Sequence, residues 1–350
     1  MNIDKSKPVM LTGATGYVGG RIAEKLLKEG HTVHAPVRQP DSKEKTKYLD
    51  AIAKNADGSI QYFKADLLES GSYDEAIQNC ELVIHCASPF IMSSKNPQED
   101  LVDPALKGTE NVLNSANKTE SVKRVVLTSS CVAMYGDAKD IRDYPNETMT
   151  ESNWNTTSSL KKSPYNYSKV LAEKKAWEIQ RQQNQWDLVT INPSFVLGPG
   201  ISPTATSESY NIMKQMGDGT FKMGAADINI GCVDVRDVAE AHYRAGYNSS
   251  AEGRHITNGE NLSFLTLADM LRPQYGDDYP LPKKNLPKWL IWTLAPMSGL
   301  TRQYVSDNVG HPWKADNTKS REKLGMNYRP IKETVNEFFS HVIDSGVFKK

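Results

Sequence analysis

The sequence predicts an α/β protein built on a doubly wound parallel sheet, with a smaller lobe at its C-terminal side. Two observations predict this fold. Short apolar strands alternate with amphipathic helical segments in the first half of the chain, and a glycine-rich turn joins the first strand to the first helix. A third observation is the length of 350 residues, which is enough for one large domain or for a domain with an added lobe.

The expected elements follow one another in the order that such a sheet requires. Val9–Leu11 is a short apolar strand, and the helix after it carries Val18, Ile22 and Leu26 on one face and stops at Gly30. Further strands are expected at 32–37, 60–64, 82–86, 124–129 and 188–191, and helices at 101–116 and 165–182. Strands this apolar indicate a parallel sheet covered on both faces, and right-handed crossovers make it doubly wound.

The pattern changes after Pro199. Residues 201–227 have no clear strand and helix rhythm, whereas Gly231–Ala245 returns to a strand and an amphipathic helix. From residue 262 onward, prolines are expected to break the chain into short pieces; they are Pro273, Pro280, Pro282, Pro287 and Pro296. We therefore expect a discontinuous core made of residues 1–196 and 231–258, and a lobe made of residues 197–230 and 259–350.

Composition excludes several classes of protein. The chain has 42 basic and 42 acidic residues, which argues against nucleic-acid binding and against a polybasic membrane protein. The N-terminus has no signal-peptide core, and the longest apolar stretch, 289–297, is too short to span a bilayer. The cysteines lack metal-ligand or paired spacing, so no metal site is expected; they are Cys80, Cys86, Cys131 and Cys232. These features predict a cytoplasmic protein that binds neither nucleic acid nor membrane.

A glycine-rich turn after the first strand predicts a nucleotide site of the Rossmann type. Gly13 permits a tight turn, Gly16 lets the backbone approach a pyrophosphate, and Gly19 lets the helix pack close to the strand. The free N–H groups and the positive dipole end of the helix then face the phosphates. The expected contacts also include the residues inside this turn, namely Thr15, Tyr17 and Val18.

The end of the second strand favours NADP(H) over NAD(H). An NAD site usually has an acidic residue about 20 residues after the glycines, but this chain has Arg38, whose guanidinium can pair with a 2′-phosphate. Lys45 is a second cation for that role. Asp66 and Leu67 follow the third strand, where the Asp66 carboxylate can cap the start of a helix.

Tyr165 and Lys169 form a YxxxK pattern at the start of a predicted helix. Residues four apart share a helix face, so the hydroxyl and the ammonium converge on one site. A tyrosine has an ordinary pKa of about 10, so acid/base work near pH 7 requires its phenolate to be stabilised relative to its phenol by roughly 4 kcal/mol. One cation at about 4 Å provides roughly that much. A serine just after the fifth strand, Ser129 or Ser130, can donate a hydrogen bond to a carbonyl oxygen at the same edge of the sheet.

Together these motifs resemble the extended branch of the short-chain dehydrogenase/reductase superfamily, also called the NAD-dependent epimerase/dehydratase family. The GxxGxxG loop, residues 83–89, 129–136, 192–194 and 233–239 carry the resemblance. It implies a catalytic triad of Ser130, Tyr165 and Lys169, with Ser129 as the alternative serine. Asn111 serves either a proton relay or helix packing, and Asp234 and Asp237 are more typical of helix caps than of catalysts. Further cofactor contacts are implied for Asp66, Leu67, Cys86, Ala87, Ser88, Thr128, Pro193 and Val196, beside Tyr165 and Lys169.

Within that branch, segments such as Val37–Pro40 and Glu151–Trp154 look like dihydroflavonol, cinnamoyl-CoA and microbial aldehyde/ketone reductases. The resemblance therefore implies a NADPH-dependent carbonyl reductase, either a monomer or a homodimer, acting on a small-molecule carbonyl substrate. The alternatives are a NAD-dependent sugar-nucleotide epimerase or dehydratase, and an NADP-binding redox sensor.

The substrate pocket is the least specified part. Pro89 and Tyr135 are the expected substrate contacts, since plant dihydroflavonol reductases have an asparagine where this chain has Tyr135. Five large apolar residues either line an apolar pocket or form the core of the lobe; they are Met213, Met216, Trp289, Trp292 and Met297. A small or aromatic aldehyde or ketone is the expected substrate.

Overall fold

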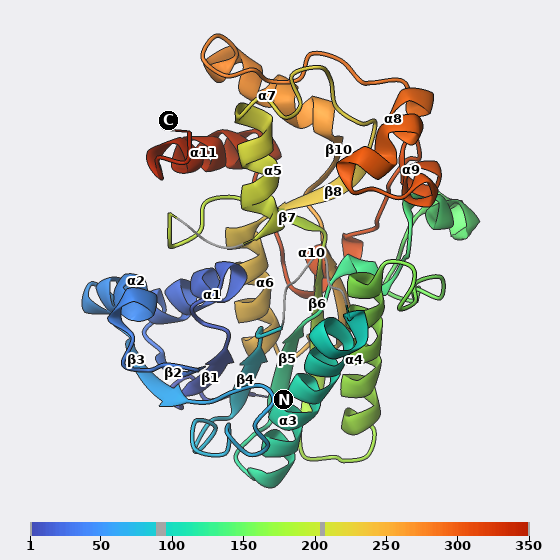
Figure 1. Cartoon of the computed structure of the whole chain (residues 1–350). Helices are drawn as coiled ribbons and strands as arrows, with labels where there is room; N and C mark the ends of the chain where they lie inside the picture. The colour runs from blue at the N-terminus through green and yellow to red at the C-terminus, as the bar shows by residue number, and fades with distance from the viewer. Residues whose placement is uncertain (1, 89–95, 204–206, 349–350) are drawn as a thin grey trace.

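The computed structural model describes residues 2–88, 96–203 and 207–348. A parallel sheet of seven strands, in the order β3-β2-β1-β4-β5-β6-β9, forms the lower part of the molecule (Figure 1). The chain order reverses beside β1, so the sheet is doubly wound as predicted. Its strands are β1 (Val9–Thr12), β2 (Thr32–Val37), β3 (Ser59–Lys64), β4 (Leu82–His85), β5 (Arg124–Thr128), β6 (Asp187–Pro193) and β9 (Gly253–Thr257).

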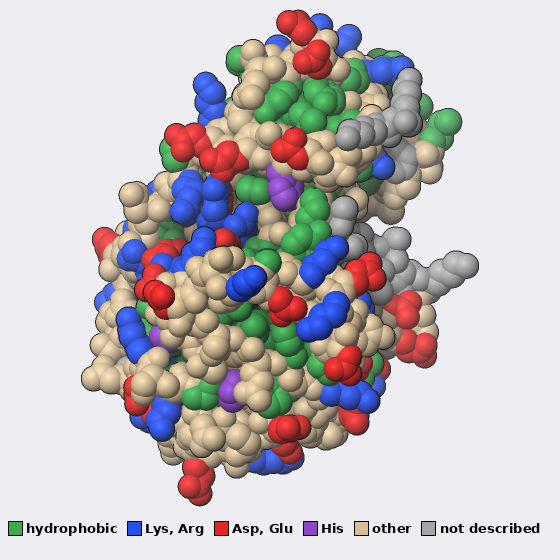
Figure 2. All heavy atoms as spheres, turned by 90° about the vertical axis from the view of Figure 1, so that its left-hand side faces the viewer, with side chains coloured by type: hydrophobic (Ala, Val, Ile, Leu, Met, Phe, Trp, Pro, Cys, Tyr) green, Lys and Arg blue, Asp and Glu red, His purple; other side chains and the backbone are tan. Residues whose placement is uncertain are grey.

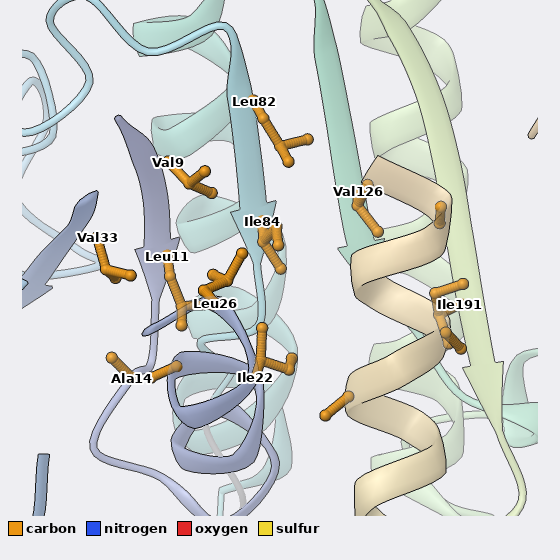
Figure 3. Close-up of a cluster of buried hydrophobic side chains, with 14 of the residues drawn as sticks. Val9, Leu11, Ala14, Ile22, Leu26, Val33, Leu82, Ile84, Val126 and Ile191 are labelled. Atoms are coloured by element: carbon orange, nitrogen blue, oxygen red, sulfur yellow. The ribbon is translucent and has the colours of Figure 1, made fainter. Parts of the chain in front are cut away.

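Helices cover both faces of this sheet. On one face, α1 (Tyr17–Lys28) packs beside α2 (Lys43–Lys54) and α6 (Val235–Tyr247), and Figure 3 shows Leu26 and Ile22 of α1 against β1 and β4. On the other face lie α3 (Asp103–Lys118), which continues a π-helical turn (Gln98–Val102), and α4 (Pro164–Gln180). Strands such as β1 and β4 are buried along their whole length because apolar helices cover both faces.

A smaller lobe sits above the carboxyl ends of the strands (Figure 1). Its sheet has three strands in the order β10-β8-β7, where β7 is Phe195–Leu197, β8 is Asn229–Asp234 and β10 is Glu260–Ser263. Helices α5 (Glu208–Gly217), α7 (Phe264–Tyr275) and α11 (Ile331–Asp344) enclose a core cluster with it. The remaining helices are α8 (Lys288–Leu294), α9 (Arg302–Asn308) and α10 (Thr318–Lys323), and short turns of 3₁₀ helix span Cys131–Ala133, Ala138–Asp143, Pro145–Glu147 and Ala295–Ser298.

Three expectations about this part of the chain are corrected. The expected core segment 231–258 begins inside β8, which pairs with β7 and β10 in the lobe and not with the large sheet. Residues 201–227 contain α5, whose N-cap Ser207 accepts a hydrogen bond from the backbone N–H of Tyr210. Pro273 does not break the chain, because it lies in the last turn of α7, where only the bond to the carbonyl of residue 269 is lost.

The five apolar residues of the expected pocket separate into two groups. Met213 and Met216 are fully buried in the core of the lobe, which agrees with the packing alternative. Trp289, Trp292 and Met297 lie on the surface around α8, with 69%, 40% and 86% of their area exposed. Within the ranges that the structure describes, no helix is both long and apolar enough to cross a membrane.

Candidate active site

The glycine turn between β1 and α1 has the tight geometry that its three glycines predict. Gly13 has a φ of +73°, and a side chain there would come within 2.9 Å of the backbone nitrogen of Ala87. A side chain at Gly19 would collide with the carbonyl of Gly13. Gly16 is the N-cap of α1 without any side-chain cap, and it is exposed together with Thr15. The turn is therefore a cradle of bare backbone at a helix N-terminus, which is the arrangement that a pyrophosphate requires.

Tyr17 and Val18 direct their side chains away from this cradle. The Tyr17 hydroxyl donates to the carbonyl of Gly198 at 2.6 Å, and its ring packs edge-on against Tyr210. Val18 packs against the core beneath the sheet. Both residues thus offer only their main chain to a ligand in the turn.

Arg38 follows β2 directly and is exposed, and Lys45 is exposed on α2. Asp66 is half-buried, and its carboxylate accepts the backbone N–H of Leu68 at 2.9 Å, so it caps a turn where a helix was considered. Leu67 packs against Gly108 of α3. Arg38 lies just beyond the carboxyl end of β2, which neighbours β1, and Asp66 just beyond that of β3, the next strand outward, while Lys45 lies in the first turn of α2.

Asn111 is occupied by the loop after β3. Its side-chain amide donates to the carbonyl of Glu69 at 2.7 Å and accepts from the N–H of Gly71 at 2.9 Å. These bonds hold residues 66–71 against α3, so the geometry favours the helix-packing interpretation of Asn111 over the relay.

The turn after β4 is fixed by Thr12. Its hydroxyl accepts the backbone N–H groups of Cys86 and Ala87 at 3.1 and 3.0 Å, and it lies 2.8 Å from Nδ1 of His85. Burial lowers the pKa of His85 to about 3, so the ring is neutral at pH 7. Ser88 lies at the end of this turn, and Pro89 lies outside the described residues.

The YxxxK pattern lies in the first two turns of α4. Ser163, with a left-handed φ of +54°, and Pro164 at the first helical position start this helix. Lys169 is 9% exposed, its Nζ lies 5.8 Å from the centroid of the Tyr165 ring, and it donates to Ser88 Oγ at 3.0 Å. Burial lowers the pKa of Lys169 to about 8, so its ammonium titrates near physiological pH.

Tyr165 is half-buried, and burial raises its pKa above the ordinary value. This direction is opposite to the one expected from a neighbouring cation. The physical reason is that the loss of solvent dominates in the protein alone, where the Lys169 ammonium lies beside the ring and donates to Ser88. A phenol with a raised pKa keeps its proton at pH 7.

The end of β5 carries the serine pair, in two different environments. Ser130 is half-buried, and its hydroxyl caps the 3₁₀ turn Cys131–Ala133 by accepting the N–H of Val132 at 3.3 Å. Ser129 is buried and donates to Glu173. Ser130 is therefore the more accessible of the two. Thr128 lies 2.7 Å from Nε2 of the buried His242, whose pKa burial lowers to about 4.

The remaining expected contacts lie near the junction of core and lobe. Pro193 ends β6, and Val196 belongs to β7, where its carbonyl accepts a bond from Ser209. The Tyr135 ring packs edge-on against Trp313 at 5.9 Å.

Asp234 caps α6 by accepting the N–H of Arg236, as expected, whereas Asp237 pairs with Arg329 of the lobe. In the space-filling view of Figure 2, the molecule narrows where the lobe meets the core.

Sequence reasoning missed a buried ion pair behind the site. Glu173, on α4 one turn after Lys169, pairs with Arg254 of β9 at 2.7 Å, and both side chains are more than nine-tenths buried. The i, i+4 spacing from Lys169 to Glu173 was a usable signal, because it places an acid on the same helix face. The partner on β9 lies 81 residues away, and no local pattern indicates it.

Comparison with known proteins gives consistent matches. The NAD dependent epimerase/dehydratase family matches residues 9–258. A cinnamoyl-CoA reductase from Medicago truncatula is 36% identical over 94% of this chain and 93% of its own length. Tetraketide alpha-pyrone reductase 1 from Arabidopsis thaliana is 36% identical over 98% of both chains. Among solved structures, the yeast methylglyoxal/isovaleraldehyde reductase complexed with NADPH has a TM-score of 0.73 and 27% identity, over 96% of this chain and 98% of that one.

Proposed function

Because this chain belongs to the NAD dependent epimerase/dehydratase family, with reductases among its relatives, we propose that it is an NADPH-dependent carbonyl reductase of aldehydes and ketones. The observation that carries the proposal is the meeting of three strand ends and α4 at one edge of the sheet. Ser88 follows β4 and Ser130 follows β5, and both strands run parallel to β1, which leads into the glycine turn. Lys169 of α4 donates to Ser88 and lies over the ring of Tyr165.

The residues around the glycine turn fit a dinucleotide with a 2′-phosphate. A side chain at Gly16 would point to the open side of the turn, and exposed Arg38 stands where an NAD site has an acid. The solved yeast relative is a complex with NADPH. We assign the 2′-phosphate to Arg38, with Lys45 in support.

When bound, NADPH supplies a hydride to the carbonyl carbon. Tyr165 donates the proton that the carbonyl oxygen then needs; because burial raises its pKa in the protein alone, this transfer depends on positive charge beside the phenolate that it leaves. Ser130 donates a hydrogen bond to the same oxygen as negative charge develops on it. Lys169 provides the positive charge that stabilises the Tyr165 phenolate left after transfer.

For the substrate, we propose small or aromatic aldehydes and ketones. Tyr135 brings a large ring with a single hydroxyl, and it packs on Trp313, so this side of the site offers more apolar surface than polar contacts. The solved yeast relative is described as a reductase of methylglyoxal and isovaleraldehyde.

The proposal is tested by following NADPH oxidation with a panel that includes a benzaldehyde-type substrate, methylglyoxal and dihydroquercetin. We expect turnover of the aldehydes with a kcat/KM above that for dihydroquercetin. A higher kcat/KM for dihydroquercetin contradicts the substrate assignment. NADPH binding without turnover of any carbonyl contradicts the reductase, and turnover of a UDP-sugar in its place indicates an epimerase.

A further inference from the structure

The buried carboxylate of Glu173 accepts hydrogen bonds from several elements around the candidate site. Ser129, directly after β5, donates to its carboxylate at 2.5 Å and Asn192 of β6 at 2.9 Å, while Trp177 donates from the next turn of α4 at 3.3 Å. The side chain is 1% exposed. A buried carboxylate with this many donors is fixed in one position, because each bond restricts a different direction of movement.

The positive charge of Arg254 balances the negative charge of Glu173. Its Nε lies 2.7 Å from Glu173, and the guanidinium also donates to the carbonyls of Glu151 and Asn153 and stacks on the ring of Trp154 at 4.0 Å. The pair therefore brings one negative and one positive charge behind the site, with the negative charge on the helix that carries Lys169.

Glu173 and Lys169 both line one small cavity. Its volume is about 10 Å³, and its lining includes Lys169, Glu173, Ser129, His85 and Thr128. This is about the space that one water occupies, and the polar lining supplies the partners that such a water needs. A water here would bridge the ammonium and the carboxylate.

We propose that Glu173 is a positioning residue that keeps the Lys169 ammonium charged and holds the end of β5 that carries Ser130. The second part rests on Asn192, which bonds Glu173 and donates to the carbonyl of Ser130 at 3.3 Å. The proposal deepens the proposed function, because it concerns the charge on which that reaction depends.

The other charged and titratable groups around Lys169 do not replace Glu173. From β4 it faces the neutral His85 and Cys86, whose thiol pKa burial raises, and on α4 itself it faces Tyr165. Burial lowers the pKa of Lys169 to about 8, while Cys86 and Glu173 both oppose that change. Because burial raises the pKa of the Cys86 thiol, that group is uncharged at pH 7, and Glu173 supplies the negative charge. Loss of this carboxylate therefore lowers the Lys169 pKa further, by about one unit for a nearby charge.

The first test is the pH profile of kcat for carbonyl reduction in Glu173→Gln. Activity falls as the pH rises through the Lys169 pKa. If the variant lowers that pKa from about 8 to about 7, it retains roughly a fifth of the wild-type rate at pH 8 and nearly all of it at pH 6. The control is Glu178→Gln on the same helix, an exposed carboxylate paired with Lys175, which keeps the wild-type profile.

Arg254→Gln provides the opposite test, because it leaves the carboxylate of Glu173 without its cation. We expect the alkaline limb of its profile to move to higher pH. If the pair has a purely structural role, both variants lower kcat at every pH and the alkaline limb of the pH profile does not move. That result overturns the proposal, and so does a shift of the alkaline limb in the same direction in both variants.

A measurement without turnover keeps this test separate from the proposed function. The NMR titration of ¹³C-labelled lysine, with the Lys169 signal identified by its loss in Lys169→Met, gives the Lys169 pKa in each variant. If Glu173→Gln does not fold, Glu173→Asp is titrated in its place, and the shorter side chain lowers the Lys169 pKa in the same direction. An unchanged pKa in a folded variant contradicts the proposal, whether or not the protein reduces carbonyls.

Discussion

At the scale of single residues, burial shifts the pKa of both members of the YxxxK pair, Tyr165 and Lys169. Burial raises the pKa of Tyr165, a neutral acid, and lowers that of Lys169, a cation, because each change favours the uncharged form. The phenol thus holds its proton at pH 7, while the ammonium approaches its titration point and depends on nearby negative charge.

Tyr165→Phe removes only the transferable proton. We expect NADPH affinity to stay within about twofold of wild type and kcat to fall by at least the 10²-fold that a general acid contributes. Steady-state kinetics and NADPH fluorescence titration measure the two effects. Tyr167→Phe, two residues further along α4 and outside the YxxxK spacing, is the control that retains kcat; if Tyr165→Phe also retains most of it, Tyr165 is not the proton donor.

Arg38→Asp tests the 2′-phosphate assignment. A charge-assisted contact contributes roughly 1.5–3 kcal/mol, so we expect NADPH to bind about 10- to 100-fold more weakly, and NADH to change far less. Isothermal titration with both cofactors measures this difference. Lys47→Asp, an equal charge change at an exposed site on α2, should leave the preference intact; equal losses for both cofactors with Arg38→Asp rule out the assignment.

Candidate residues related by a short spacing could be found from the sequence, whereas residues that meet across long sequence separations were missed. Tyr165, Lys169 and the three glycines have short spacings whose geometry follows from one helix or one turn. Arg254 reaches Glu173 from a strand 81 residues away, and Thr12 reaches the turn after β4 across 74 residues, so only the folded sheet brings them together.

At the scale of elements, the turn between β1 and α1 sets how closely helix and strand approach. Gly19 is needed because any side chain there meets the backbone of Gly13, whereas a methyl group at Gly16 would lie 3.2 Å from that carbonyl and otherwise point to open space. The two glycines therefore have separable roles, one in packing and one in ligand approach.

Gly19→Ala and Gly16→Ala should separate these roles. We expect Gly19→Ala to lower the free energy of unfolding by about 1–3 kcal/mol, the usual cost of overpacking, and to weaken NADPH binding with it. Gly16→Ala should keep wild-type stability within roughly 1 kcal/mol and still bind NADPH at least tenfold more weakly. Urea unfolding and NADPH titration measure the two; equal stability losses in both variants contradict this division.

Element boundaries were predictable where apolar periodicity was strong and a capping signal was present. Six of the seven strands of the large sheet lie where the apolar runs predicted them, while the seventh, β9, and the helix α11 were not anticipated. Periodicity did not reveal which sheet β8 would join, because its pairing with β7 and β10 depends on how the lobe folds over the core. Pro273 was misread because a proline in the last helical turn costs only one bond.

At the scale of the whole molecule, α1, the helix that follows the glycine turn, packs directly against the lobe. The Tyr17 ring of α1 stacks near Phe338 of α11 at 6.3 Å, and Tyr210 of α5 packs edge-on against the same Phe338 at 4.8 Å. Arg21 of α1 donates to the carbonyl of Pro199 at 2.7 Å. These contacts join the core and the lobe through side chains that are not part of either sheet.

We therefore expect wild-type unfolding in urea to be one cooperative transition, with tryptophan fluorescence and far-UV circular dichroism coinciding. Phe338→Ala should lower the free energy of unfolding by about 3–5 kcal/mol, because the ring is fully buried, and should separate the two curves. Two resolved transitions in the wild-type protein would show that these contacts do not couple the units.

The three-stranded sheet β10-β8-β7 has a consequence for how such a protein can be altered. The chain enters the lobe at β7, returns to the core through α6 and β9, and enters the lobe again at β10, so no single cut separates the two parts. A lobe from another reductase cannot be transplanted as one cassette; both segments and the β7–β8 pairing have to be exchanged together. Diversification of substrate range in this architecture is therefore expected to proceed by point substitutions and loop insertions within the lobe, and not by domain shuffling.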